Sequence, residues 1–131
     1  IPFIFWSKNI INRKLQKNPR ASCIRAMTNP SQTPFKMWRR DQGTYLTPIL
    51  QKEYKEFYEN NPEPHSLPRQ LLPEIVVQTG YLAVIRPHII TDMHSMSGKN
   101  ILPCYHDPDL YTELDSLKDL HHTEFMLKKY E

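Results

Sequence analysis

The chain has 131 residues, of which 39% are hydrophobic and 24% charged, and its formal net charge is +3. A chain of this length forms one ordinary domain at most, and its apolar content excludes a fully disordered protein. The chain has only three glycines, and Ser97-Gly98-Lys99 lacks the upstream glycine of a P-loop, so the glycine-rich phosphate loops of nucleotide-binding enzymes are excluded.

Proline is unusually frequent, with 12 residues in the chain. Each proline removes a backbone donor and restricts the residue before it, which disfavours long helices and central strands. No uncharged stretch approaches the roughly 20 apolar residues that span a bilayer, so we expect no transmembrane segment. The fold class that we expect is mainly α with extensive irregular, Pro-rich extended segments, two capped helices, one small β-hairpin and little independent core.

The first segment of the chain, residues 1–40, is basic. It contains nine lysines and arginines and no acidic residue, whereas residues 41–131 contain eight basic and fourteen acidic residues. Such charge segregation is typical of an arm that faces a polyanion or an acidic protein surface. We therefore expect an extended basic arm over residues 1–40, which includes a short N-terminal helix, and a small mainly helical and irregular region over residues 41–131.

Aromatic side chains are interleaved with the cations of this arm. The segment Phe35-Lys36-Met37-Trp38-Arg39-Arg40 can stack unpaired bases while it neutralises phosphates, and the same residue types anchor protein interfaces. A solvated flexible tail is the alternative, but it would expose large aromatic groups to water. The candidates for RNA or partner binding are Arg13, Lys14, Lys17, Arg20, Arg25, Phe35, Lys36, Trp38, Arg39 and Arg40.

A helix is predicted over residues 48–60. Thr47 can accept hydrogen bonds from free backbone donors as the N-cap, and Pro48 suits the first helical position. The apolar residues that recur on one face are Leu50, Tyr54, Phe57 and Tyr58. Three prolines over residues 61–68 then predict an extended connector.

The central apolar segment has two possible structures. Residues 75–77 and 81–85 are β-branched and aromatic runs on either side of Gln78-Thr79-Gly80, which favours a short hairpin with its turn at Gly80. A helix that begins at Pro73 is the alternative, because continuous apolar runs do not distinguish a buried strand from a buried helix. We expect this segment in the core in both cases.

A second capped helix is predicted over residues 108–129. Asp107 followed by Pro108 repeats the cap-then-proline pattern, and acidic residues come early in the segment while lysines come late. This order of charges favours the helix dipole.

Histidines gather in the second half of the chain, and with nearby residues they make a set of conceivable metal ligands: His88, Asp92, His94, Cys104, His106 and Asp107. Structural zinc sites bring ligands in closely spaced pairs, and neither CxxC nor HxxxH occurs, so we expect no metal and no cofactor. Cys104 with His106, or Ser95 with His94, could be written as catalytic dyads. Adjacency in sequence does not establish their geometry, so we expect no catalytic residues and no enzyme.

The basic segment over residues 7–17 is similar to a mitochondrial targeting segment or its remnant. The chain does not begin with methionine, which fits either a fragment of a longer chain or a removed leader. The two cysteines are too few for a disulfide-dependent secreted domain and indicate a reducing compartment. We therefore expect the mitochondrial matrix or the matrix face of the inner membrane.

These features together are typical of a non-catalytic accessory subunit that takes its order from neighbouring subunits of a large assembly. The first hypothesis is a mitochondrial ribosomal protein that binds rRNA and several neighbouring proteins. The alternative is a supernumerary subunit of a respiratory-chain or ATP synthase complex, with its arm on acidic subunits or an anionic membrane surface. A small enzyme of unknown reaction is the second alternative.

Overall fold

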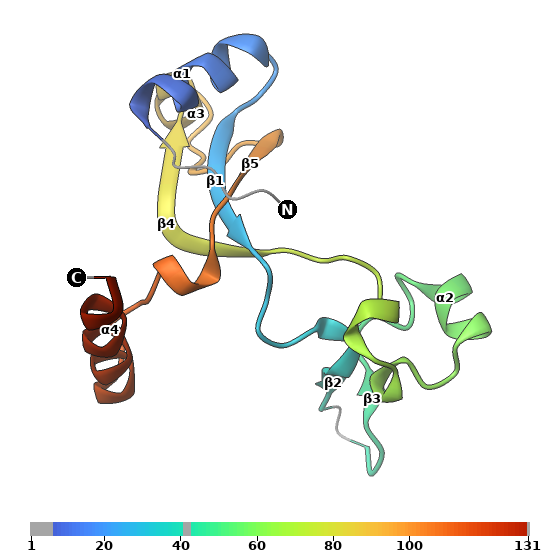
Figure 1. Ribbon diagram of the computed structural model, residues 1–131. Helices are drawn as coiled ribbons and strands as arrows, with labels where there is room; N and C mark the ends of the chain where they lie inside the picture. Colours follow the sequence, from blue (N-terminus) through green and yellow to red (C-terminus); the bar gives the residue numbers. More distant parts are fainter. Residues whose placement is uncertain (1–6, 41–42, 131) are drawn as a thin grey trace. The chain divides into compact units, whose positions relative to one another are not determined.

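The computed structural model describes residues 7–40 and 43–130. The chain divides into two compact units, of which unit 1 is Ile1–Asn29 with Val76–Glu131, and unit 2 is Pro30–Ile75 (Figure 1). Unit 2 is therefore inserted between two parts of unit 1. The boundary expected at residue 40 falls inside unit 2, and the first part of the expected arm belongs to unit 1.

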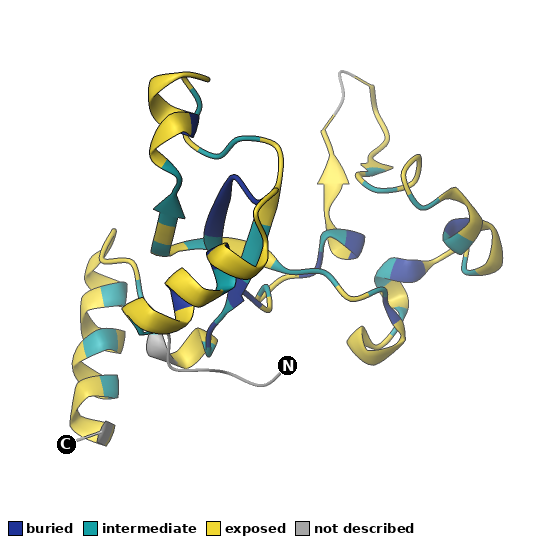
Figure 2. Cartoon of the chain, turned by 90° about the horizontal axis from the view of Figure 1, so that it is seen from above, coloured by how far each residue is buried: buried dark blue, intermediate teal, exposed yellow. Residues whose placement is uncertain are grey.

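Unit 1 is built on a three-stranded mixed sheet in the order β4-β1-β5. Strand β1 (Cys23–Thr28) lies in the centre, antiparallel to β4 (Val77–Ile85) and parallel to β5 (Ile101–Tyr105). β1 is the central strand of this sheet, and its small and apolar side chains at Cys23, Ile24 and Ala26 are fully buried. Figure 2 shows buried residues gathered along this strand.

Helix α1 (Lys8–Lys17) packs its apolar stripe on this sheet. Ser7 caps the helix by accepting a hydrogen bond from the backbone N–H of Ile10 at 3.4 Å. Ile11 and Leu15, one turn apart, are buried against Ile24 and Cys104. Burial of each large aliphatic side chain contributes about 1.5–3 kcal/mol, so the helix belongs to the core of unit 1.

The connection between β4 and β5 contains α3 (Pro87–Thr91) and a tight turn at Gly98. Gly98 has a φ of 65°, a conformation that favours glycine. The same residue lies directly against the Ser22 side chain, which leaves no room for a Cβ atom. The start of β1 and the turn before β5 are thereby held close together.

The rest of unit 1 follows β5. A short 3-10 turn, η4 (Pro108–Leu110), is capped by Asp107, whose carboxylate accepts from the backbone N–H of Asp109 at 2.9 Å. Helix α4 (Leu117–Tyr130) then begins after Ser116. The Ser116 hydroxyl donates to Asp119 Oδ2 at 2.6 Å and accepts from the Asp119 backbone N–H at 3.3 Å, which is a reciprocal cap.

Unit 2 folds around Phe35, whose side chain is only 1% exposed. The rings of Tyr54 and Phe57 meet it edge-on at centroid distances of 5.0 and 5.4 Å, and the ring of Tyr58 lies at 6.2 Å. The elements of this unit are η1 (Pro34–Lys36), β2 (Trp38–Arg39), β3 (Thr47–Pro48), α2 (Lys55–Asn60), η2 (Pro64–Ser66) and η3 (Arg69–Leu71).

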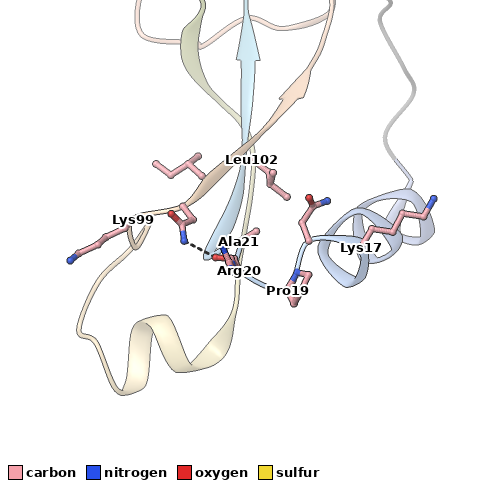
Figure 3. A pocket seen from close by; sticks show the side chains of 9 residues that line it. Lys17, Pro19, Arg20, Ala21, Lys99 and Leu102 are labelled. Carbon is pink, nitrogen blue, oxygen red and sulfur yellow. Dashed lines mark hydrogen bonds between the residues drawn. The ribbon is translucent and has the colours of Figure 1, made fainter.

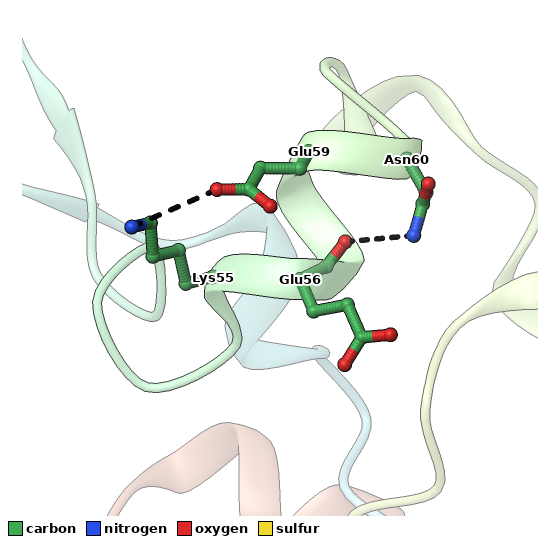
Figure 4. Close-up of polar contacts among 4 residues, drawn as sticks. All are labelled: Lys55, Glu56, Glu59 and Asn60. Atoms are coloured by element: carbon green, nitrogen blue, oxygen red, sulfur yellow. Dashed lines mark hydrogen bonds and ion pairs between the residues drawn. The ribbon is translucent and has the colours of Figure 1, made fainter.

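The exposed side of α2 carries local polar contacts (Figure 4). Lys55 and Glu59 form an ion pair at 3.7 Å, and the Asn60 side chain donates to the backbone carbonyl of Glu56 at 3.0 Å. Exposed pairs of this kind contribute little to stability. The apolar face of α2 therefore does most to hold the helix in place.

The expectation of a mainly α fold with little independent core is wrong. The described residues form four α-helices, a three-stranded mixed sheet and a two-stranded sheet, and about 38% of them are helical and 20% in strands. The packed core of the larger sheet is contributed by segments far apart in the chain. Pairing between strands that are distant in sequence supplies a core that local sequence patterns do not indicate.

The helix predicted over residues 48–60 is also shorter than expected. Thr47 and Pro48 pair with Arg39 and Trp38 in the β2-β3 ladder, so Thr47 cannot act as an N-cap, and α2 begins at Lys55. The predicted apolar face nevertheless packs on Phe35.

The expected hairpin and the expected C-terminal helix also differ from the elements in the structure. The hairpin expected around Gly80 is one continuous strand, β4, because β1 rather than the strand's own second half pairs with it. The helix predicted over residues 108–129 is interrupted, since Asp107 caps only η4 and the reciprocal cap at Ser116 begins α4 nine residues later.

Within the described ranges, none of the helices combines the length and the apolar character needed to cross a lipid bilayer.

Candidate nucleic-acid interface

A basic pocket of about 580 Å³ lies in unit 1, at the C-terminal end of α1 and the N-terminal ends of β1 and β5 (Figure 3). Three of its lining side chains are cations, and no described lining residue is acidic. Figure 3 shows Lys17 and Lys99 at opposite sides of the pocket, with Arg20 between them. The lining residues are Lys17, Asn18, Pro19, Arg20, Ala21, Lys99, Asn100, Ile101 and Leu102.

The walls of this pocket are fixed by hydrogen bonds between segments distant in sequence. The Asn100 side chain donates to the backbone carbonyl of Arg20 at 2.9 Å, and the Ser22 backbone N–H donates to the Asn100 carbonyl at 2.8 Å. On the helix side, the Asn18 side chain donates to the Lys14 carbonyl at 2.8 Å. The backbone that carries Lys17, Arg20 and Lys99 is therefore held in one arrangement.

The three cations of the pocket are exposed, and within the part of the chain that the structure describes none of them forms an ion pair. Three cations with no carboxylate among the described lining residues give this pocket a positive potential, which attracts anions. The pocket therefore has the electrostatics of a site for a phosphate group.

Arg86 supports the pocket from inside unit 1, and sequence reasoning did not single it out. Its guanidinium donates to the carbonyls of Ala21 and Leu15, both at 2.7 Å, and to that of Asn18 at 3.3 Å. These carbonyls include the C-terminal end of α1, where a cation is favoured by the helix dipole. A single arginine between an apolar run and Pro87 carries no sequence signal for this role.

We expect Arg86→Met to lower the free energy of unfolding by about 1.5–3 kcal/mol, because a charged donor to three carbonyls is lost. Urea titration followed by circular dichroism measures this change. Arg39→Met is the matched control, because Arg39 is exposed on β2 in unit 2 and its substitution should alter stability by less than about 0.5 kcal/mol. Equal effects of the two substitutions would contradict the supporting role of Arg86.

The other candidate cations of unit 1 have different surroundings. Arg13 is exposed on α1. The Lys14 ammonium donates to the Pro103 carbonyl, and the Arg25 guanidinium donates to the Met96 carbonyl and to the Ser97 hydroxyl, the latter at 2.8 Å. Lys14 and Arg25 therefore make contacts inside unit 1, and they are less available to an external anion than Lys17 and Arg20.

In unit 2, the candidate residues separate into a buried ring and an exposed group. Phe35 is the centre of the core, so its ring is not available to stack a base. Trp38 is 40% exposed and packs on His65 at 4.8 Å between ring centroids. Lys36, Arg39 and Arg40 are exposed. Unit 2 thus exposes part of the Trp38 ring, and the cations Lys36, Arg39 and Arg40 are close to it in sequence.

The conceivable metal ligands do not come together in one group, and Cys104 lacks the state of an activated nucleophile. No group of three or more His, Cys, Asp or Glu side chains in the described ranges could hold a metal ion. Burial raises the pKa of the Cys104 thiol to about 11, an effect that Lys14 partly offsets, so this group is not a thiolate at neutral pH. His106 instead contacts the Thr79 hydroxyl, at 2.7 Å from Nε2.

Comparison with known proteins gives no assignment for this chain. No protein-family model matches it, and no curated protein has a similar sequence.

Proposed function

We propose that the chain is a non-catalytic accessory subunit of the mitochondrial ribosome that binds rRNA through the pocket of Lys17, Arg20 and Lys99. One observation carries this proposal: three exposed cations surround a cavity whose described lining residues include no carboxylate. Phosphate contacts from lysine and arginine dominate the affinity of proteins for RNA and DNA.

The form of the pocket also suits a nucleic-acid backbone. Its side-chain amides at Asn18 and Asn100 already bind protein carbonyls, so the three cations are the groups left to meet an anion. Arginine can donate to two phosphate oxygens at once, while lysines act as point charges. Contacts of this kind fix the position of a backbone without reading its sequence.

Unit 2 supplies the second element of the proposal. The exposed ring of Trp38 and the neighbouring cations can stack an unpaired base and neutralise its phosphate. The matrix location and the neighbouring protein subunits are parts of the same proposal and follow from the ribosomal assignment.

The test is the salt dependence of RNA binding by the full chain. Lys17→Gln, Arg20→Gln and Lys99→Gln together should reduce the log-log slope of affinity against salt by about three units, one for each lost phosphate contact, for structured RNAs of different sequence alike. The matched control combines Lys52→Gln, Lys118→Gln and Lys128→Gln, which removes the same charge from exposed positions outside the pocket. This control should leave the slope nearly unchanged.

Two outcomes would contradict the proposal. Equal losses of slope in both triple variants would show that net charge, not the pocket, attracts RNA. A slope near zero for the unmodified chain would remove the ribosomal assignment. In that case, binding to phosphatidylcholine vesicles that contain cardiolipin would favour the alternative of a respiratory-chain or ATP synthase subunit.

A further inference from the structure

A second cavity in unit 1, of about 360 Å³, lies between the segment after β5 and the last turns of α4. Its size is at the lower end of ligand pockets, which suits one side chain or a small molecule better than a large cofactor. No described lining residue is a lysine or an arginine. The residues that matter here are Tyr81, Asp109, Tyr111, Thr123, Met126 and Leu127.

Two tyrosine rings form a corner of this cavity. The rings of Tyr81 and Tyr111 are nearly perpendicular, at 82°, with centroids 5.8 Å apart. Tyr81 is 45% exposed, so its ring can be reached from solvent. Faces of aromatic rings carry partial negative charge and attract cations.

His106 holds this corner in place. Its ring lies 4.9 Å from that of Tyr81 and 5.5 Å from that of Tyr111. The His106 side chain is itself buried and contacts the Thr79 hydroxyl at 2.7 Å and the Asp107 carbonyl at 3.0 Å. The two tyrosine rings are therefore packed on a fixed support.

The Glu113 carboxylate, which is bound to the Tyr111 hydroxyl, adds negative charge near the corner. The hydroxyl donates to Glu113 Oε1 at 2.5 Å, and this hydrogen bond is the main reason that the pKa of Tyr111 is raised. Gly80 permits this approach, because a Cβ atom there would lie 2.6 Å from the Tyr111 hydroxyl oxygen. A phenol that donates to a carboxylate has a more electron-rich ring, which strengthens attraction for a cation.

The chain around the cavity is acidic as a whole. Residues 107–130 contain three lysines (Lys118, Lys128 and Lys129) and six acidic residues (Asp107, Asp109, Glu113, Asp115, Asp119 and Glu124). This charge repels nucleic acid and attracts basic segments of proteins. The charge of this cavity is therefore opposite to that of the pocket of Lys17, Arg20 and Lys99, the site of the proposed RNA contact.

We propose that the corner between Tyr81 and Tyr111 binds the side chain of an arginine from a basic segment of a partner protein. The guanidinium stacks on a tyrosine ring and donates to the Asp109 carboxylate, and its aliphatic stem lies against Met126 and Leu127. Arginine fits better than lysine because its planar group can stack and donate at the same time. This site is independent of the proposed RNA contact.

The probe is acetyl-arginine methylamide, added to the isotope-labelled full chain and followed by NMR. Its neutral analogue, acetyl-citrulline methylamide, has nearly the same shape without the charge. We expect saturable shifts at Tyr81, Tyr111 and Met126 with the arginine derivative, and affinity at least fivefold weaker for the citrulline derivative, in line with the strength of cation-π contacts.

Three variants locate the binding. Tyr111→Leu removes the ring and should weaken binding about fivefold, whereas Tyr111→Phe keeps the ring and should weaken it less than threefold. Tyr45→Leu is the matched control, because Tyr45 is 86% exposed in unit 2, and it should leave affinity unchanged. The amide resonances of β1, β4 and β5 report whether each variant keeps its fold.

The proposal is overturned if both derivatives bind equally, or if Tyr111→Leu binds as tightly as Tyr111→Phe while the sheet resonances are unchanged. Shifts confined to acidic side chains away from the tyrosines would also overturn it, because they would show only diffuse attraction between charges. Should Tyr111→Leu fail to fold, Gly80→Ala replaces it, since the added methyl group displaces the Tyr111 hydroxyl and should weaken binding by at least twofold.

Discussion

Phe35→Ala should lower the free energy of unfolding of unit 2 by about 3–5 kcal/mol, because a fully buried aromatic side chain is replaced by a cavity. The ring is 1% exposed, and three other aromatic rings pack directly on it. Few residues remain in this unit to take over its core, so the loss would unfold much of it. Hydrogen exchange of the Tyr58 and Asn61 amides, which are bonded within the turns of α2, measures the change.

Tyr45→Ala is the control for this substitution. Tyr45 belongs to the same unit and also loses an aromatic ring, but its side chain is 86% exposed. Its substitution should change stability by less than about 0.5 kcal/mol. If Phe35→Ala exchanged its amides no faster than Tyr45→Ala, the core assigned to unit 2 would be incorrect.

Gly98→Ala should destabilise unit 1 by about 2–5 kcal/mol, from backbone strain and overpacking together. An alanine at a φ of 65° is strained in any surroundings. In addition, its Cβ atom would lie 2.4 Å from the Cβ atom of Ser22, a rigid part of the chain beside β1. Chemical denaturation of the full chain, followed by circular dichroism, gives the difference.

Gly43→Ala is a matched comparison, since a Cβ atom at Gly43 meets no heavy atom within 4 Å. It should be neutral or slightly stabilising, because alanine reduces the freedom of the unfolded chain. A loss of stability in Gly98→Ala no larger than that in Gly43→Ala would mean that the turn before β5 adapts freely, and the close packing of Gly98 on Ser22 would then have no energetic weight.

Local signals in the sequence predicted part of this fold. The helix expected near the start of the chain corresponds to α1, and the apolar face expected around Tyr54 and Phe57 does pack into a core. Both features depend on neighbours three or four residues away, which a linear sequence displays.

The sheet could not be predicted in the same way. Cys23 pairs with Ile85 on one side and with Ile101 on the other, and no local pattern indicates which distant strand a segment joins. Local patterns therefore favour a hairpin over residues 75–85, with a helix from Pro73 as the alternative, whereas the structure has one strand paired with β1. Among the candidate cations, Lys17 and Arg20 line the basic pocket, while Lys99 joins them only because β5 lies beside β1. No sequence pattern indicates that Arg86 supports this pocket.

The insertion of unit 2 also affects the order in which the chain can fold. The last residue of β1, Thr28, pairs with the first residue of β4, Val77. The two ends of the connection between these strands, residues 29–76, which contains unit 2, therefore lie side by side. Bringing these positions together in an unfolded chain requires closure of a long loop, whose entropic cost grows with its length. If unit 2 folds first around Phe35, this loop is already compact when the sheet forms. During synthesis, β1 stays unpaired until β4 and then β5 have left the ribosomal exit tunnel.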